Sequence, residues 1–161
     1  MGDTSHSDSD LMRHALATLA YRAGKVLRDA PDSFGAFAAG EDGRTASQIL
    51  AHLGDLMDWA LSMADGSKQW RDSSLLPWKD GVTRFFSAVK AFDDYLASGK
   101  QVHAPLEKLF QAPVADALTH VGQLAMMRRL AGCKMKGENY FVAEIVTGRV
   151  GLEQAAPRRE F

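Results

Sequence analysis

The chain has 161 residues, of which 46% are hydrophobic, and its formal net charge is −1. This length fits one domain, and the hydrophobic fraction is sufficient for a packed core. Because there is no excess of basic residues and no apolar stretch of the ~18–20 residues that cross a bilayer, we expect neither a nucleic-acid partner nor a membrane partner.

Residues 1–9 are polar and predict a disordered lead-in, followed by a single domain over residues 10–161. The lead-in lacks the basic and apolar regions of a signal peptide. Cys133 is the only cysteine, so an internal disulfide cannot form. Both observations favour a cytoplasmic protein. The first helix is predicted to run from a cap at Asp10 to about Asp29.

Apolar residues recur at three- and four-residue steps in the next two predicted helices, which is typical of helices packed on one side. The second helix is predicted to start at a capping box formed by Thr45 and Gln48. A connector of residues 67–79 carries two tryptophans and leads to a third helix over residues 80–98, with Asp80 as its cap.

A fourth helix is predicted from Pro113 to Gly132, because proline is favoured in the first turn and glycine just past the end of a helix. The remaining residues, 133–161, have no clean hydrophobic period. Four helices of about 18–20 residues with apolar faces predict an all-α four-helix bundle, with this C-terminal tail packed on it.

The fourth helix carries a polar stripe. Asp116 and His120 are four residues apart, and Gln123 is three further on, so all three share one face. His52 lies on the flank of the apolar stripe of the second helix. Two imidazoles and one carboxylate that face an open position are found in hydrolytic enzymes and oxygenases.

This pattern predicts a site for a divalent metal, Zn, Ni or Fe, with His52, Asp116 and His120 as ligands. Asp55 and Gln123 are the predicted outer partners of the site. Two imidazoles that share one ion should lie within about 6 Å of each other.

Each of these residues also has an ordinary structural role open to it. A carboxylate in the first turn of a helix, the predicted position of Asp116, is stabilised by roughly 0.3–1 kcal/mol through the unpaired N–H groups there. Histidines near a core commonly form hydrogen bonds within it, and Gln123 can pack between helices. The residues alone leave a metal site and a hydrogen-bonded network both open.

The segments ILAHLGDLMDWAL and THVGQLAMMRRLAG, with GENYF and GRVG in the tail, resemble the DinB/YfiT-like metalloenzyme superfamily. The resemblance implies an up-down-down-up bundle, often a homodimer, with a divalent metal held by three histidines. One histidine comes from the second helix and two come from a His-x-x-x-His pair on a later helix. His52 and His120 match the first and last of these positions, and Asp116 stands at the middle one.

The resemblance further implies a metal-dependent enzyme that joins a low-molecular-weight thiol, such as bacillithiol or mycothiol, to a small-molecule substrate. With Asp116 at the middle position, two expectations follow. Either Asp116 is a ligand of an active transferase or hydrolase, or the metal site is degenerate and the protein is a non-catalytic, stress-associated dimer. The connector around Trp70 and Trp78 is the predicted apolar surface for a dimer. No nucleotide or flavin motif supports a third class.

Overall fold

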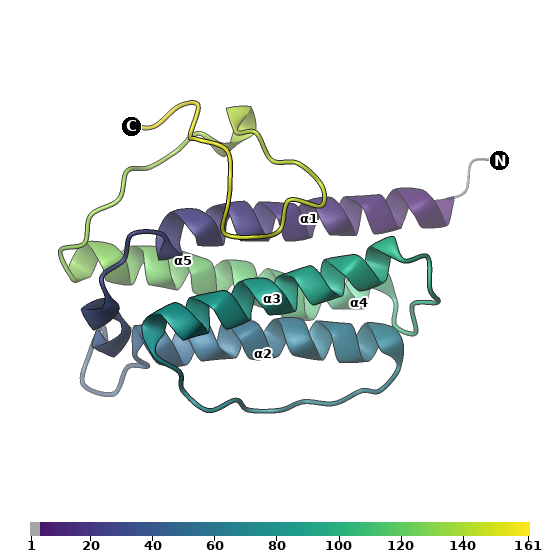
Figure 1. Cartoon of the computed structure of the whole chain (residues 1–161), viewed down its shortest axis with the longest axis horizontal. Coiled ribbons are helices and arrows are strands. Elements are labelled where there is room, and N and C mark those ends of the chain that lie inside the picture. Colours follow the sequence, from purple (N-terminus) through teal and green to yellow (C-terminus); the bar gives the residue numbers. More distant parts are fainter. Residues whose placement is uncertain (1–3) are drawn as a thin grey trace.

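The computed structural model describes the backbone of residues 4–161 and the side chains from residue 8 onward. The fold is all-α, as predicted, and four long helical segments form a bundle (Figure 1). The segments are α1 (Thr4–Leu27), α2 (Ala46–Asp65), α3 (Trp78–Ala97), and a fourth that joins α4 (Leu106–Leu109), a π-helical turn (Phe110–Val114) and α5 (Ala115–Leu130). Two short 3-10 turns, Asp32–Ala36 and Tyr140–Val142, lie outside the bundle helices.

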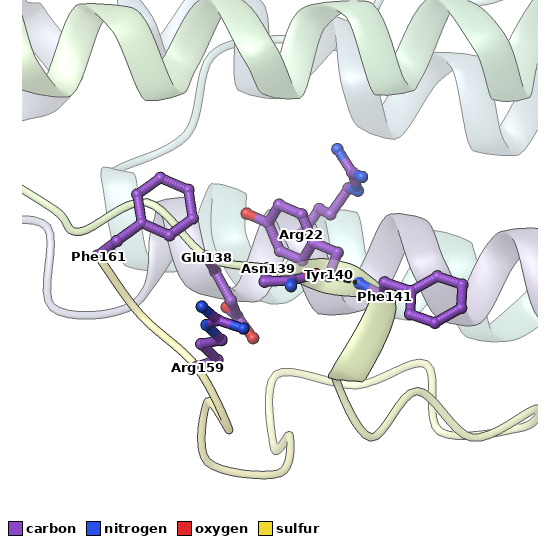
Figure 2. A pocket seen from close by; sticks show the side chains of 7 residues that line it. All are labelled: Arg22, Glu138, Asn139, Tyr140, Phe141, Arg159 and Phe161. Carbon is purple, nitrogen blue, oxygen red and sulfur yellow. Dashed lines mark hydrogen bonds between the residues drawn. The ribbon is translucent and has the colours of Figure 1, made fainter.

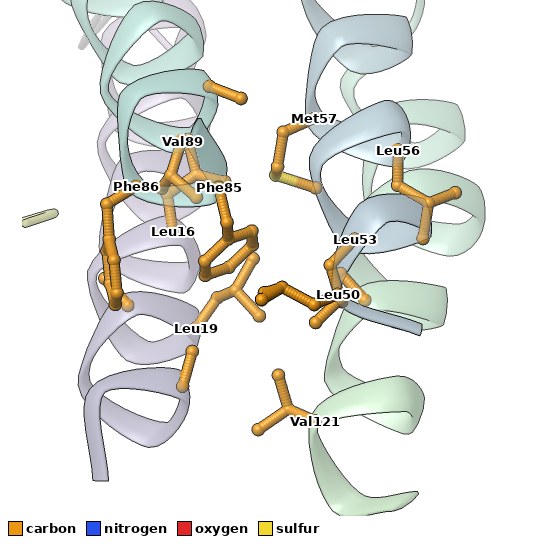
Figure 3. Close-up of a cluster of buried hydrophobic side chains, with 14 of the residues drawn as sticks. Leu16, Leu19, Leu50, Leu53, Leu56, Met57, Phe85, Phe86, Val89 and Val121 are labelled. Carbon is orange, nitrogen blue, oxygen red and sulfur yellow. The ribbon is translucent and has the colours of Figure 1, made fainter. Parts of the chain in front are cut away.

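The core lies between the four segments. α2 packs against α3 and α5, and α1 packs against the same two helices. Large apolar side chains from all four fill the interior, among them Leu16, Leu53, Phe85 and Val121 (Figure 3). Burying such a side chain stabilises the fold by roughly 1.5–3 kcal/mol, so this interior is the main force that fixes the packing of α2 on α5. None of the described helices combines the length and apolarity needed to cross a membrane.

The start of α1 differs from the prediction. Asp10, the predicted cap, lies inside a helix that begins at Thr4. The part of the predicted lead-in from residue 4 to residue 9 is therefore helical, and residues 1–3 lie outside the described part of the chain. The polar residues before Asp10 have no apolar period, so the pattern contained no signal for this extension.

The starts of α2 and α3 show one confirmed cap and one wrong one. At the start of α2, the Thr45 backbone N–H donates to the Gln48 side chain at 2.7 Å, and the Gln48 N–H donates to the Thr45 hydroxyl at 3.2 Å. The predicted capping box is thus confirmed. α3 begins at Trp78, so Asp80 lies within its first turn and is not its cap. Gly66 ends α2 in the left-handed conformation, with φ of 87°.

The fourth segment begins earlier than predicted. Helical backbone starts at Leu106 and continues without a break to Leu130, with Pro113 inside the π-helical turn. A π-helical turn is wider than an α-helical one, which accommodates a residue that has no N–H and whose ring would crowd an α-helix. Asp116 consequently lies inside a continuous helix and not at an open N-terminus.

The connector between α2 and α3 follows the length of α2 (Figure 1). The Gln69 backbone N–H donates to the Ser62 hydroxyl at 3.0 Å, and the Ser73 N–H donates to the Asp55 carboxylate at 3.2 Å. The connector thus runs back along α2 from its C-terminal to its N-terminal end. The N-termini of α2 and α3 therefore lie at the same end of the bundle. α2 and α3 therefore run in the same direction. The up-down-down-up order expected from the resemblance also has its second and third helices parallel.

The C-terminal tail packs on the bundle, as predicted, and returns over α1 (Figure 1). Val150 is buried in the core, at 4% exposure. Glu138 accepts hydrogen bonds from Tyr21 and Lys25 of α1, at 2.5 Å and 3.0 Å. The tail is thus fastened by apolar packing and by a buried polar contact.

Candidate metal site

The packing of α2 on α5 brings His52 to Asp116 and His120. The Nε2 atoms of His52 and His120 lie 3.6 Å and 3.5 Å from the same carboxylate oxygen, Oδ2 of Asp116. The centroids of the two imidazole rings are 4.9 Å apart, so their predicted proximity is confirmed. One ligand atom from each residue lies within 4.8 Å of the others. The three side chains are close enough to hold one metal ion.

The spacing of these atoms fits ligands better than hydrogen-bond partners. Ligand atoms at the usual 2.0–2.1 Å from a tetrahedral ion are about 3.3–3.4 Å from one another, close to the observed spacing. A hydrogen bond from an imidazole N–H to a carboxylate would instead be about 2.7–3.2 Å long. Neither imidazole forms a hydrogen bond with Asp116, and the side-chain partner of His120 is Gln123.

The site opens to solvent at its carboxylate. The side chains of His52 and His120 are 22% and 14% exposed, whereas that of Asp116 is 47% exposed. The imidazoles are thus held by the surrounding helices while the carboxylate lies at the mouth of the site. One side of the carboxylate thus faces solvent.

Gln123 contacts the site from one turn further along α5. Its Oε1 lies 2.7 Å from Nδ1 of His120. When Nδ1–H donates to this oxygen, the lone pair of the ring is on Nε2, which faces Asp116. Gln123, one of the two predicted outer partners, thus lies where it can set the tautomer and the orientation of His120.

Asp55, the other predicted outer partner, turns toward α3. Its carboxylate accepts from Arg84 at 2.8 Å and from the backbone N–H of Ser73 at 3.2 Å. A carboxylate that is only 5% exposed needs such a cationic partner, because an unpaired charge in a core is strongly unfavourable. Asp55 is therefore not a partner of His52, although one helical turn separates them in sequence.

Two indole rings beside the site were missed by the sequence analysis. The ring of Trp70 lies 5.7 Å from that of His52 and 5.8 Å from that of Trp59, measured between centroids. Trp59 follows His52 by two helical turns, which was a signal for a shared face. Trp70 is in the connector, and only the path of the connector along α2 brings it there. The indole of Trp70 thus forms an apolar surface next to His52, and the indole of Trp59 packs against it.

Comparisons of the chain with protein-family models, curated proteins and solved structures found no match. Membership of the DinB/YfiT-like superfamily therefore stays a prediction from the sequence resemblance. The fold and the geometry of the site are the observations that bear on function.

Proposed function

We propose that this chain binds a divalent metal ion through His52, Asp116 and His120, and that the ion serves a thiol-dependent transferase of the DinB-like type. The observation that carries the metal assignment is the spacing of 3.5 Å and 3.6 Å between one carboxylate oxygen and two imidazole nitrogens. Imidazole and carboxylate ligands suit Zn, Ni and Fe, so the proposal is for one of these divalent ions.

The position of Asp116 in its helix supports its role as a ligand. In the sequence, a first-turn carboxylate could be explained by the unpaired N–H groups of a helix start. The helix continues back to Leu106, so the N–H groups around Asp116 follow earlier helical turns. Unpaired N–H groups at a helix start therefore do not explain the presence of a carboxylate at position 116. This supports the proposal that Asp116 is a metal ligand.

The residues around the site suit a reaction between a thiol and an electrophile. A bound divalent cation would supply positive charge that favours the ionised form of a thiol. Of the three proposed ligands only Asp116 would supply a negative charge, so the ligands would offset the charge of the ion only in part. Trp70, with Trp59 packed against it, offers an apolar surface for the carbon skeleton of the electrophile. The sulfur would form the new bond to an electrophilic carbon, the bond from that carbon to its leaving group would break with the electron pair going to the leaving group, and the thiol proton would pass to solvent.

The metal assignment is tested by elemental analysis of untagged protein after supply of Zn, Ni or Fe. We expect about one ion per chain, and loss of most of it in His52→Ala and His120→Ala. His103→Ala is the matched control, because His103 is exposed in the connector between α3 and α4. Wild-type protein that retains none of the three metals would favour the degenerate, non-catalytic bundle.

The transferase assignment has a separate test. Metal-loaded protein should accelerate the reaction of cysteine, used as a simple thiol, with 1-chloro-2,4-dinitrobenzene, and the acceleration should disappear in His120→Ala. Protein that binds metal but gives no acceleration with this or other small thiols would keep the metal site and remove the transferase reaction.

We further propose that the chain is a cytoplasmic homodimer, but the surface predicted for the dimer needs a correction. Trp78 is buried at 5% exposure, with its ring 5.2 Å from that of Phe34, so it offers no free surface. The apolar side chains that the connector does expose are Trp70, Leu75 and Leu76. Light scattering at high micromolar concentration should give about twice the chain mass of 17.6 kDa, and a monomer would contradict the dimer.

A further inference from the structure

A wide, open surface cavity of about 540 Å³ lies between α1 and the C-terminal tail (Figure 2). This volume is within the range of small-molecule sites, about 300–1,000 Å³. Two segments of the tail run side by side at its edge, where Gly137 and Phe161 exchange two backbone hydrogen bonds of 3.1 Å. No ligand of the proposed metal site lines this cavity, so the two are separate.

The cavity has an excess of positive charge. Arg22 from α1 and Arg159 from the tail both line it, and the ion pairs among the described side chains include neither of them. Glu138 is the acidic residue of the lining, but its side chain is fully buried and bound to Lys25 at 3.0 Å and to Tyr21. Lys25 also binds Glu160 at 2.9 Å, so it compensates these two carboxylates only in part. With two guanidinium groups and one carboxylate, the lining still keeps one net positive charge for an anion.

Aromatic surfaces stand next to these cations. The guanidinium of Arg22 lies over the Tyr140 ring, 4.1 Å from its centroid. Such a contact uses the face of the guanidinium and leaves N–H groups at its edge for an acceptor. Phe161, also in the lining, is 82% exposed, and its ring is close to Gly137, where a Cβ would come within 2.6 Å. The glycine thus leaves room for the ring in its observed place.

We propose that this cavity binds small aromatic acids, which goes beyond the function proposed for the metal site. The carboxylate of the ligand would lie between Arg22 and Arg159 and bind a guanidinium group, which matches a carboxylate in geometry and charge. Its ring would pack against Phe161 and Tyr140, where aromatic rings prefer edge-to-face or offset contacts. A ligand with only one of these two features would leave either the cations or the rings without a partner.

The test is isothermal titration calorimetry on the full chain, stripped of metal with a chelator so that a carboxylate cannot bind an ion at the other site. The probe is 2-naphthoate, with 2-naphthalenemethanol and cyclohexanecarboxylate as the neutral and the non-aromatic comparison. We expect 2-naphthoate to bind most tightly. Arg22→Gln and Arg159→Gln should each weaken its binding by roughly tenfold, because each removes one of the two positive charges that attract the carboxylate. The matched control is Arg44→Gln, at an exposed arginine before α2, which should bind like wild type.

A second variant tests the aromatic part of the site. Gly137→Ala should displace the Phe161 ring and weaken 2-naphthoate several-fold, with the thermal unfolding midpoint close to that of wild type. Equal affinity for 2-naphthalenemethanol, full binding in the Arg22→Gln, Arg159→Gln double variant, or no binding of 2-naphthoate at millimolar concentration would each overturn the proposal.

Discussion

The guanidinium of Arg84 on α3 lies directly against Gly54 on α2, in space that a Cβ at position 54 would occupy. From there Arg84 donates to Asp55 at 2.8 Å, and Asp55 also accepts from the backbone N–H of Ser73 in the connector. One glycine thus allows a contact that fastens both α3 and the connector to the helix that carries His52. The parallel arrangement of α2 and α3 depends on this contact as well as on apolar packing.

Gly54→Ala should lower the free energy of unfolding by about 1–3 kcal/mol, because the added methyl group displaces Arg84 and leaves the buried Asp55 without its cation. The measurement is urea unfolding followed by circular dichroism. Gly122→Ala is a matched control on α5, where a Cβ would meet nothing within 4 Å. The control should raise the free energy of unfolding by about 0.5–1 kcal/mol, since alanine is the better helix former. The same stabilisation in both variants would contradict the role of Arg84.

Much of the fold follows from the sequence where neighbouring residues decide the structure. The capping box at Thr45 is one example, because both of its hydrogen bonds join residues three apart. The start of the fourth segment could not be predicted in this way. A proline such as Pro113 usually opens a helix, and the pattern contains no signal for a π-helical turn that places it inside one.

The site was predictable only in part, for a similar reason. Spacing along α5 places Asp116 and His120 on one face whatever the rest of the chain does. The presence of His52 opposite them depends on how two helices pack, and its prediction drew on the resemblance as well. Asp55 was assigned wrongly because its partner, Arg84, is 29 residues away in the sequence. Tertiary contacts of this kind leave no mark on local spacing.

Gln123→Ala should weaken metal binding by about 10–100-fold, the usual effect of losing a hydrogen bond that orients a histidine ligand. Without the Gln123 oxygen, the ring of His120 can turn, and the proton on Nδ1 loses its acceptor. Competition with a chromophoric zinc chelator measures the affinity. Thr119→Ala is the control, because the exposed Thr119 hydroxyl donates to a backbone carbonyl on its own helix. Unchanged affinity in Gln123→Ala would show that the contact does not serve the metal.

Tyr21→Phe should change how stability depends on alkaline pH. Burial, and then the hydrogen bond to Glu138, raise the pKa of Tyr21 above its usual value near 10. Above that pH the phenol ionises in the unfolded chain but not in the folded one. The unfolded chain then binds fewer protons, so the free energy of unfolding falls as pH rises. Removing the phenol should make this fall shallower by up to about 1.4 kcal/mol per pH unit, measured by urea unfolding from pH 9 to 11.

The control for this titration is Tyr95→Phe, which removes a phenol that donates to the backbone carbonyl of Gln101. An equal change of slope in both variants would contradict the role of Glu138. A loss of stability in Tyr21→Phe that is the same at every pH would reflect only the lost hydrogen bond.

Arg128→Met should destabilise the fold by about 2–4 kcal/mol. The Arg128 side chain, at the end of α5, donates to the carbonyls of Val26 and Arg28 at 2.7 Å and 3.0 Å, which closes the end of α1. The residue is only 6% exposed, and burial lowers its pKa. Methionine keeps the apolar stem but leaves these carbonyls without a donor. Thermal and urea unfolding measure the loss, and Arg129→Met, at an exposed neighbour, should stay within about 0.5 kcal/mol of wild type.

Asp116→Ala separates the two roles open to this carboxylate. As a ligand, Asp116 supplies one of three bonds to the ion, so its loss should lower metal affinity sharply, whereas Asp116→His should retain or raise it. As a carboxylate at a helix start, its loss would cost roughly 0.3–1 kcal/mol of stability and leave metal content unchanged. Because the helix continues back to Leu106, we expect no such cost in the metal-free protein. Metal stoichiometry and urea unfolding, measured side by side with His120→Ala, decide between them. Full retention of metal in Asp116→Ala, with loss in His120→Ala, would remove Asp116 from the ligand set.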